Sequence, residues 1–468
     1  MKIPGERTEG MEPQNANWHV GVGRKCITPF PGVELAGLGY YLKRTWDRIH
    51  DDLNATALVI TGADGESIAM LALDILYVDA AAVRAIRDQA AARTGLRPEC
   101  ICVNASHSHN APTLAFFDGA GEMHTDYVAL VVGRAVEALE SAWRSRQPAR
   151  LHVGAATLRG LTFNRTRERG PVDERLGVLR ADSLDGRPLA VAVNFHSHPT
   201  VFCHVEPRSV SRDCVGQMVD SLEGALPGAT ALYLQGSCGD VNYLMEYWTP
   251  ERYREVGTAL FEAAQSALAG AREVRVPGVS AALRQGKLPA RRWTRDEVLS
   301  MYEEGRHRLS TGDTAGWLEG IASKVVGLPH RLPERYGGSV DRAVEAVSRF
   351  AVRWGEDVLP KLDMLPETRI AEFQAMRIGD AWVVTNPAEF FSSLALEIRR
   401  RWSYPDLFIL GYSNGATSYL PDAYEVDRGS YASLHVPKAV RQLPFTREAG
   451  AVAVEESLAA LREAAAAR

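Results

Sequence analysis

Apolar and polar positions divide the chain into short strand-like runs and longer helical stretches. Residues 18–28 alternate in polarity, and apolar runs at 57–60 and 67–73 flank a turn with two glycines at 62–65. Alternation with a period of two predicts a half-buried strand, and a short turn between apolar runs predicts a β-hairpin. This part of the chain is therefore expected to form strands that pair locally.

A helix and a further strand follow the hairpin. Residues 79–93 are expected to be helical, with Asp79 as the N-cap and Gly95 as the stop signal. The apolar run at 100–103 then predicts a short buried strand. The order strand, helix, strand is typical of a βαβ-like unit.

The same two patterns continue to the C-terminal region and define the expected fold class. Strand-like runs recur at 150–154, 189–195, 230–234, 368–378, 381–385 and 407–411, and helical stretches at 125–143, 213–222, 251–268 and between 389 and 402. We expect an α/β fold of mixed β-sheets layered with helices, with the functional site at strand ends.

One long segment departs from this alternation. Residues 294–359 contain several helical stretches broken at glycine and proline, which predicts a helical insert at about 290–365. We expect the insert to act as scaffold, and capping of the site is the alternative. The rest of the chain is expected to form a single domain over residues 18–468, preceded by a flexible N-terminal arm at 1–17.

Composition argues against several classes of function. The 468 residues carry a formal net charge of −5 and contain no basic run with interleaved aromatics, so a nucleic-acid partner is not expected. No apolar stretch approaches the ~20 residues that span a bilayer, and the N-terminus lacks the apolar core of a signal peptide. Cys100 and Cys102 are two of only six cysteines and lie on one expected strand, which is atypical of a disulfide framework and favours a cytoplasmic protein.

Two histidine pairs point to metal chemistry. The sequences His107-Ser-His109 and His196-Ser-His198 each come shortly after an apolar run, and together they hold four of the 12 histidines. A single pair of this kind is more often structural than metal-binding. Imidazole is, however, the commonest nitrogen ligand of zinc, and the repeated arrangement strengthens the hypothesis of a zinc site.

Two polar segments are candidates for the same site. Residues 235–242 follow a strand-like run, and residues 163–166 form an expected polar loop from which Arg165 could reach an anion or a carbonyl oxygen. From that loop alone, a solvated arginine is the simpler interpretation. Asp240 has two interpretations, since it could orient a ligating imidazole or hold its own glycine-containing turn.

Several segments form an ordered set of motifs. They are His107-Ser-His-Asn-Ala-Pro112, Asn164-Arg-Thr166, His198, Pro387-Ala-Glu-Phe390 and Ser418-Tyr419, with Tyr431 twelve positions after Tyr419. This set, in this order, resembles the catalytic domain of the neutral ceramidase family. The resemblance covers the chain from about residue 18 to about residue 438 and is interrupted by the helical insert.

The resemblance implies a site as well as a neutral-ceramidase-like catalytic domain. The implied zinc ligands are His107, His198, Glu389 and Tyr419. The implied substrate-contacting and acid/base residues are His109, Arg165 and Tyr431. His196 is then expected to be structural, because only His198 of its pair matches a ligand of the family.

Two departures from the family pattern bear on the substrate. Family members have a serine that is often discussed as a nucleophile, whereas this chain has Asn242, which cannot act as one. The immunoglobulin-like C-terminal domain and the secretory signal of the family are also not seen in this sequence. Both departures disfavour a membrane sphingolipid and favour a small, soluble acylated metabolite.

These residues predict hydrolysis without a serine. A water bound to zinc can have a pKa near 7, and the resulting hydroxide can attack an amide or ester carbonyl. We expect His109 to pass a proton to the leaving amine, while Arg165, Tyr431 and the Asn242 amide stabilise the developing oxyanion. The leading hypothesis is a zinc-dependent amidohydrolase that cleaves a C–N bond.

Three other functions stay open at the level of sequence. Cys238 could act as a thiolate nucleophile in an acyl-transfer enzyme, although this leaves Glu389 and Tyr419 without a role. A metal-dependent phosphoesterase would use the same ligands. A zinc-containing binding protein without catalytic activity is the third alternative, prompted by Asn242.

Overall fold

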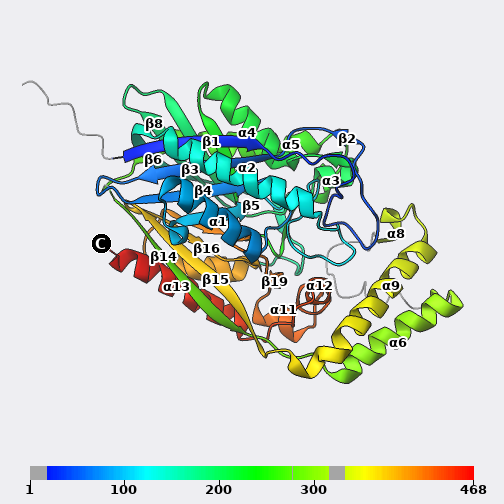
Figure 1. Cartoon of the computed structure of the whole chain (residues 1–468). Coiled ribbons are helices and arrows are strands. Elements are labelled where there is room, and N and C mark those ends of the chain that lie inside the picture. Colours follow the sequence, from blue (N-terminus) through cyan, green and yellow to red (C-terminus); the bar gives the residue numbers. More distant parts are fainter. Residues whose placement is uncertain (1–17, 277, 316–331, 468) are drawn as a thin grey trace, which may run out of the picture.

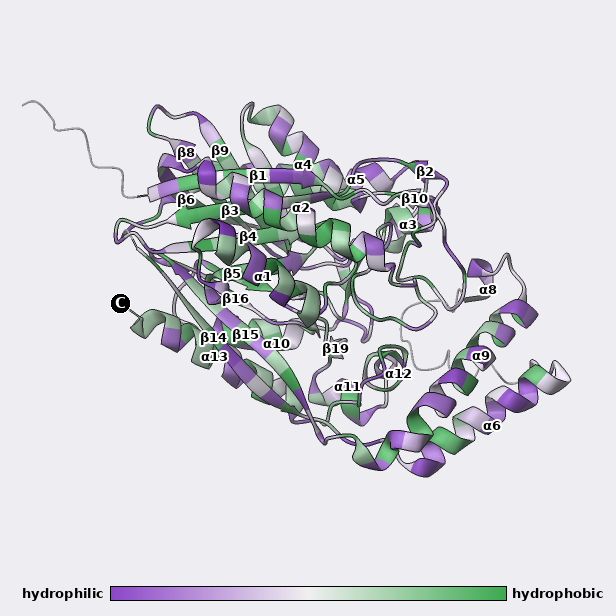
Figure 2. Ribbon diagram, in the orientation of Figure 1, coloured by the Kyte–Doolittle hydropathy of each residue, from purple (hydrophilic) through white to green (hydrophobic). Residues whose placement is uncertain are grey.

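The computed structural model describes residues 18–276, 278–315 and 332–467, so the expected arm at 1–17 lies outside the described residues. Two β-sheets pack face to face, and helices cover their outer faces (Figure 1). The expected α/β fold of mixed sheets layered with helices is confirmed. Hydrophobic residues concentrate in the central strands, as Figure 2 shows for β3 (Asn54–Thr61) and β4 (Ser67–Leu73).

The larger sheet contains nine strands. Its order is β11-β9-β8-β6-β1-β3-β4-β5, with β13 beside β6. Besides β3 and β4, its strands are β1 (Trp18–Cys26), β5 (Ile101–Ala105), β6 (Gln147–Thr157), β8 (Arg175–Ser183), β9 (Pro188–Phe195), β11 (Thr230–Gln235) and β13 (Arg272–Glu273). The pairs β4–β5 and β9–β11 are parallel and the other pairs are antiparallel.

The predicted βαβ-like unit is present. Helix α1 (Ala80–Thr94) connects the parallel strands β4 and β5. The Asp79 side chain caps the helix by accepting a hydrogen bond from the Ala82 amide at 2.7 Å, and Gly95 ends it in the left-handed conformation at φ 76°. Both end signals act as predicted.

Four main helices cover the outer face of the larger sheet. They are α1, α2 (Thr125–Arg144), α4 (Asp213–Ala225) and α5 (Tyr253–Ala269). Helix α2 lies directly on β1, because Gly21 and Gly23 leave room for it. A Cβ atom at Gly23 would be only 2.2 Å from the Ala138 carbonyl oxygen, and one at Gly21 only 2.0 Å from that of Ala142.

The smaller sheet has the order β14-β15-β16-β18. Its strands are β14 (Val279–Pro289), β15 (Thr368–Ile378), β16 (Ala381–Thr385) and β18 (Leu407–Leu410), and α10 (Ser392–Arg401) and α13 (Ala449–Ala466) cover its outer face. The predicted hairpin about residues 379–380 joins β15 and β16. Leu58 and Ile60 of the larger sheet share one buried core with Met376 and Phe408 of the smaller sheet.

The segment between residues 290 and 365 contains helices α6 (Arg295–Thr311), α8 (Leu332–Arg335) and α9 (Val340–Val358), and then a 3₁₀ segment, Leu359–Met364. Helices α6 and α9 lie side by side at one end of the molecule (Figure 1, lower right). Residues 316–331 lie outside the described residues. The boundaries of a separate insert and the single-domain assignment stay predictions.

Short elements complete the described chain. The short strands form the pairs β2 (Arg48–Ile49) with β10 (Ser209–Val210), β7 (Thr162–Asn164) with β12 (Val241–Tyr243), and β17 (Glu389–Phe390) with β19 (Tyr419–Leu420). The short helices are α3 (Phe202–Val205), α11 (Ala423–Asp427) and α12 (Val436–Ala439), with 3₁₀ turns Pro98–Cys100 and Met245–Tyr247 and a π-helical turn Tyr431–His435. Part of the expected polar loop at 163–166 is thus strand β7.

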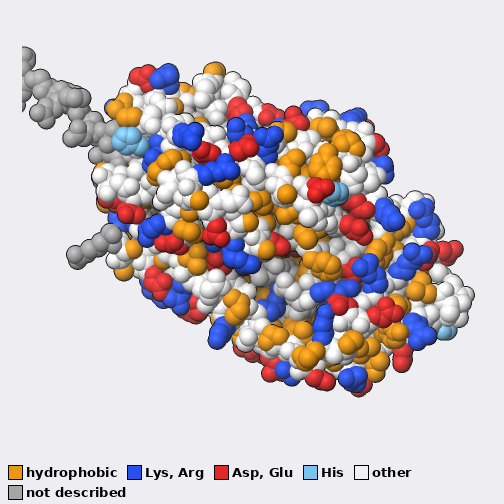
Figure 3. Space-filling view, in the orientation of Figure 1, with side chains coloured by type: hydrophobic (Ala, Val, Ile, Leu, Met, Phe, Trp, Pro, Cys, Tyr) orange, Lys and Arg blue, Asp and Glu red, His pale blue; other side chains and the backbone are white. Residues whose placement is uncertain are grey.

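The surface agrees with the composition. Figure 3 shows Lys and Arg side chains interspersed with Asp and Glu on the face that it displays, without a continuous basic patch. Among the described helices, none combines the length and the apolar character that a membrane crossing requires.

Candidate metal centre

The ends of three strands build the site. His107 and His109 follow β5, His198 follows β9, and the loop at 235–242 follows β11. The side chain of Asn104 links β5 to β11 and to the end of β18. Its Nδ2 donates to the Gly411 carbonyl at 2.8 Å and its Oδ1 accepts from the Gln235 amide at 2.7 Å. The two terminal strands of the larger sheet, β5 and β11, contact each other here, so residues that are distant in sequence meet.

Three imidazoles converge at this edge. One ring nitrogen from each of His107, His109 and His198 lies within 4.8 Å of the others. His107 and His198 are each only 1% exposed. Burial lowers the pKa of His107 to about 3 and lowers the pKa values of His109 and His198 well below their ordinary value. The three rings are therefore neutral at pH 7.

Hydrogen bonds to the backbone assign the tautomer of each ring. In every case Nδ1 lies 3.0 Å from a carbonyl oxygen, which belongs to Leu76 for His107, to Gly37 for His109 and to Val241 for His198. A neutral ring that donates through Nδ1 carries an unprotonated Nε2.

The Nε2 atoms of His107 and His109 are only 3.3 Å apart, so two lone pairs face each other. A cation on His107 or a proton on His109 would relieve this contact, and nitrogen donors of this kind suit zinc. The donor set therefore fits a bound metal ion, although it does not identify the ion.

Glu389 and Tyr419 complete the donor set. They lie opposite each other in the parallel pair β17–β19. Glu389 Oε2 is 3.1 Å from His198 Nε2 and 3.5 Å from His107 Nε2. The four residues that the sequence proposes as ligands are thus brought together, and His109 lies beside them.

Two tyrosines hold Glu389, and sequence reasoning did not identify them. The Tyr77 hydroxyl donates to Oε1 of Glu389, and the Tyr412 hydroxyl donates to Oε2 at 3.3 Å. Burial raises the pKa of both tyrosines well above the ordinary value, so both stay protonated donors. The sequence signal that could have identified them is their position, because each tyrosine follows a strand that ends at the site.

Arg165 lies in the site rather than in solvent, so the simpler sequence interpretation was wrong. Its Nη2 donates to the Gly239 carbonyl at 2.9 Å and to the Tyr419 hydroxyl at 2.5 Å, and it is 3.3 Å from His198 Nε2. The short pair β7–β12 delivers it there, a pairing that the sequence pattern did not show. Burial opposes its charge, but Tyr419 and Glu389 outweigh burial and raise the pKa of Arg165 above its ordinary value.

A cavity of about 250 Å³ opens beside these groups. His109, Arg165, Asn242, Tyr419 and Tyr431 line it. Apolar side chains form much of the rest of its wall, namely Leu38, Tyr40, Phe117, Trp248, Met301, Val347, Phe350 and Ala432. Three of these belong to α6 and α9, so these two helices contribute to the wall of the cavity.

Comparison with solved structures assigns this architecture. The crystal structure of neutral ceramidase from Pseudomonas aeruginosa superposes with a TM-score of 0.69 at 19% sequence identity, covering 96% of this chain and 75% of that chain. The chain has the neutral ceramidase fold. A structure of a ceramidase complexed with C2 gives a TM-score of 0.70 at 19% identity, covering 96% of this chain and 76% of that chain. No family model and no curated protein matches the sequence.

In this ceramidase fold, Asn242 and Tyr431 both line the cavity. Asn242 bridges to His198 through the backbone, and its buried Oδ1 has no hydrogen-bond partner among the described residues. Tyr431 is 37% exposed, and its ring centroid is 6.1 Å from that of Tyr419. Both side chains are positioned to contact a molecule in the cavity.

Asp240 and His196 lie behind the site. Asp240 accepts hydrogen bonds from the amide and hydroxyl of Ser392 at 2.8 and 2.9 Å and from Asn164 Nδ2 at 2.7 Å, and burial raises its pKa to about 6. It therefore holds two loops and contacts no imidazole among the described residues. His196 accepts from the Ser237 amide at 3.0 Å and is not one of the three converging imidazoles.

Cys238 is poorly suited to act as a nucleophile. Its Sγ is fully buried and lies 3.0 Å from the Tyr412 hydroxyl. Burial raises the pKa of the thiol well above its ordinary value. Because the thiolate is the reactive form, this environment disfavours the acyl-transfer alternative.

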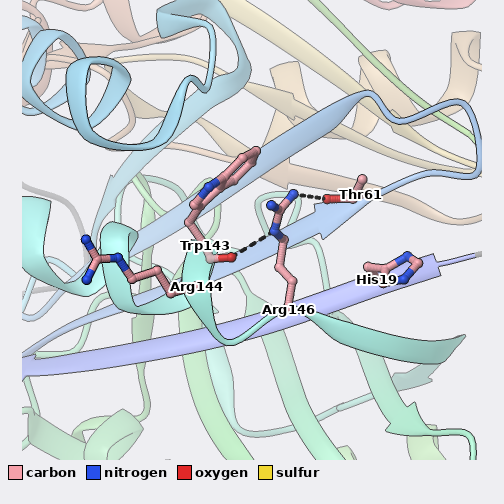
Figure 4. A pocket seen from close by; sticks show the side chains of 5 residues that line it. All are labelled: His19, Thr61, Trp143, Arg144 and Arg146. Carbon is pink, nitrogen blue, oxygen red and sulfur yellow. Dashed lines mark hydrogen bonds between the residues drawn. The ribbon is translucent and has the colours of Figure 1, made fainter.

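A second cavity lies at the surface and shares no lining residue with the first. His19, Thr61, Trp143, Arg144 and Arg146 line it (Figure 4). Arg146 stacks on the Trp143 ring at 3.2 Å and donates to Thr61 Oγ1 at 2.8 Å, so its guanidinium is already engaged. With one histidine and no carboxylate in its wall, this cavity offers no comparable donor set.

Proposed function

We propose that the protein is a zinc-dependent hydrolase that cleaves the C–N amide bond, or an ester bond, of a small, soluble acylated metabolite. The observation that carries this proposal is the convergence of neutral imidazole lone pairs with Glu389 beside a cavity of about 250 Å³. Such a set of nitrogen and oxygen donors with substrate space next to it is typical of catalytic metal sites. The neutral ceramidase fold supports the same chemistry.

His107, His198, Glu389 and Tyr419 are the proposed zinc ligands. When bound, the ion supplies Lewis acidity and an activated water at neutral pH. Two backbone carbonyls hold the rings of the two ligand histidines, and Tyr77 and Tyr412 hold the carboxylate. Partners that fix ligand orientation in this way contribute strongly to metal affinity.

The remaining groups of the site act on the substrate. His109 presents its unprotonated Nε2 to the site and is fixed through Nδ1, so it can take up a proton and deliver it to the leaving amine. Arg165 is held as a cation beside Tyr419, where it can stabilise negative charge on the carbonyl oxygen. Tyr431 and the Asn242 side chain line the same cavity and are proposed to assist.

The cavity supports a compact substrate. At about 250 Å³ it is smaller than the ~300–1,000 Å³ typical of sites for drug-sized ligands. Its largely apolar wall suits the acyl group, while the polar residues gather near the histidines. A small acylated amine fits these properties better than a long-chain lipid.

We also propose a cytoplasmic location. All six cysteines are unpaired and five of them are buried. Free buried thiols of this kind are typical of a reducing compartment.

The test combines elemental analysis with a hydrolysis panel. Wild type, His107→Ala and Glu389→Ala are compared on amides, esters and phosphoesters, with the surface variant His19→Ala as a matched histidine control. We expect about one zinc per chain in wild type and the control, and loss of both zinc and amide hydrolysis in the two site variants. A wild type that is active without metal contradicts the proposal. Zinc without turnover of any substrate supports the binding-protein alternative, and turnover of phosphoesters alone supports a phosphoesterase.

A further inference from the structure

One hydroxyl group of the helical insert makes two hydrogen bonds to the loop beside the site. Tyr336 directly follows α8 and is only 5% exposed. Its hydroxyl accepts a hydrogen bond from the Tyr40 amide at 3.0 Å and donates one to the Tyr40 carbonyl at 2.6 Å. The Tyr40 ring in turn stacks on Phe350 of α9, with ring centroids 4.5 Å apart. The insert thus binds Tyr40 by both its backbone and its ring.

The same loop fixes the orientation of His109. The Gly37 carbonyl lies 3.0 Å from His109 Nδ1, and the Gly37 amide donates to the Ala120 carbonyl at 2.8 Å. Contact between loop and ring is tight, since a Cβ atom at Gly37 would be 2.4 Å from Nδ1 of His109. A small shift of the loop therefore moves or releases the imidazole.

We propose that Tyr336 is a positioning residue for His109, acting from the insert through the loop at residues 37–40. This inference rests on the proposed function, in which His109 delivers a proton to the leaving group. Without the Tyr336 hydroxyl, the amide and carbonyl of Tyr40 both lose their partner, and the loop that carries the Gly37 carbonyl is held less firmly. The insert then has a part in the chemistry as well as in the cavity wall.

The loop has other anchors, so removal of this hydroxyl should act locally. Arg44 donates to the Ala36 carbonyl at 3.1 Å, and the Tyr41 amide donates to the Gly119 carbonyl at 2.6 Å. Both bonds survive in a Tyr336→Phe variant, which keeps the ring and its packing. Tyr302→Phe is the matched control, because Tyr302 is on α6 of the same insert but packs beside Gly355 and Arg306 rather than against the loop at residues 37–40.

The first measurement compares an amide with a p-nitrophenyl ester of the same acyl group. An amine must be protonated to leave, whereas p-nitrophenolate leaves without a proton. Misplacement of the proton donor should therefore lower kcat for the amide by about 10- to 100-fold in Tyr336→Phe. We expect the ester kcat, the KM values and the zinc content to change little, and Tyr302→Phe to resemble wild type. Equal loss on both substrates, or loss of zinc, overturns the proposal.

The second measurement does not depend on turnover. In zinc-loaded protein with ¹⁵N-labelled histidine, the Nδ1–H resonances of His107, His109 and His198 report their bonds to backbone carbonyls. Tyr336→Phe should shift or broaden the His109 resonance and leave the other two unchanged, whereas Tyr302→Phe should change none. An unaltered His109 resonance contradicts the positioning role. If wild type hydrolyses neither substrate, the proposed function fails while this comparison still decides whether Tyr336 positions His109.

Discussion

The Tyr77 hydroxyl donates a hydrogen bond to Oε1 of Glu389, although the two residues are 312 positions apart in the chain. Tyr77 comes shortly after β4 of the larger sheet, and Glu389 begins β17, which follows β16 of the smaller sheet. One hydrogen bond therefore links the two sheets at the proposed metal centre. The orientation of the carboxylate depends on how the sheets pack.

Removal of the Tyr77 hydroxyl should weaken metal binding. In Tyr77→Phe the carboxylate keeps its charge but loses one of its two tyrosine partners, so we expect zinc affinity to fall by about 10- to 100-fold. The measurement is competition with a chelator of known affinity. Tyr127→Phe is the matched control, because Tyr127 is also buried but donates to the Ile27 carbonyl away from the site. An equal loss in both variants would indicate a general effect on folding.

Replacement of Arg165 by lysine should lower catalysis although the charge is kept. A lysine ammonium cannot reproduce the planar guanidinium that contacts both Gly239 and Tyr419. We expect kcat to fall about 100-fold with little change in zinc content. Arg167→Lys is the control, since Arg167 pairs with Asp422 and lies over the Tyr424 ring outside the cavity wall. Unchanged kcat in Arg165→Lys would exclude the proposed role.

Cys238→Ala should keep activity within about threefold of wild type. Burial raises the pKa of the Cys238 thiol, and the thiol takes part in no step of the proposed reaction. Steady-state kinetics, together with the rate of inactivation by iodoacetamide, provide the check. Loss of hydrolysis in a folded, zinc-loaded Cys238→Ala protein would instead favour the thiolate mechanism.

Stability should depend on pH through Asp74. Burial raises the pKa of this carboxyl to about 6 in the folded state, above the ~3.9 of an unfolded chain. The protonated form is thus favoured by folding, so the stabilising contribution of Asp74 is complete below about pH 4 and is lost as the pH rises through 6. Asp74→Asn mimics the protonated form and keeps an oxygen for the Asn54 amide, which now donates to Asp74 at 2.9 Å.

The expected signature is a difference between wild type and variant that grows with pH. Relative to wild type, Asp74→Asn should gain about 1–2 kcal/mol in free energy of unfolding between pH 4 and pH 7. Urea denaturation at both pH values measures this gain. A difference that stays constant with pH would show that Asp74 has the same pKa in the folded and unfolded states.

The regular elements and the histidine placement were predictable from sequence. Alternation marks β1, and Asp79 and Gly95 mark the ends of α1 because their side-chain and backbone preferences act locally. His107 and His198 were expected at strand ends, and each follows a strand of the larger sheet, β5 and β9. These features depend on short-range patterns or on simple topology.

The contacts that organise the site were not predictable. Strand pairs β7–β12 and β17–β19 are only two or three residues long, so they carry no periodic signal, yet they place Arg165, Glu389 and Tyr419. The roles of Tyr77 and Tyr412 depend on how two sheets pack. Helices α6 and α9 line the cavity because of tertiary contacts, which no local sequence pattern encodes.

The cavity wall is built partly by the insert and partly by strand ends, and this division affects how substrate preference can evolve. Strand ends supply the proposed reacting groups, whereas Met301, Val347 and Phe350 of α6 and α9 supply apolar surface for the bound molecule. Mutations in these helices can therefore alter which acyl groups are accepted while the reacting groups stay in place. Mutant libraries confined to these positions should yield new substrate preferences, and natural sequence divergence at the same positions can have the same effect.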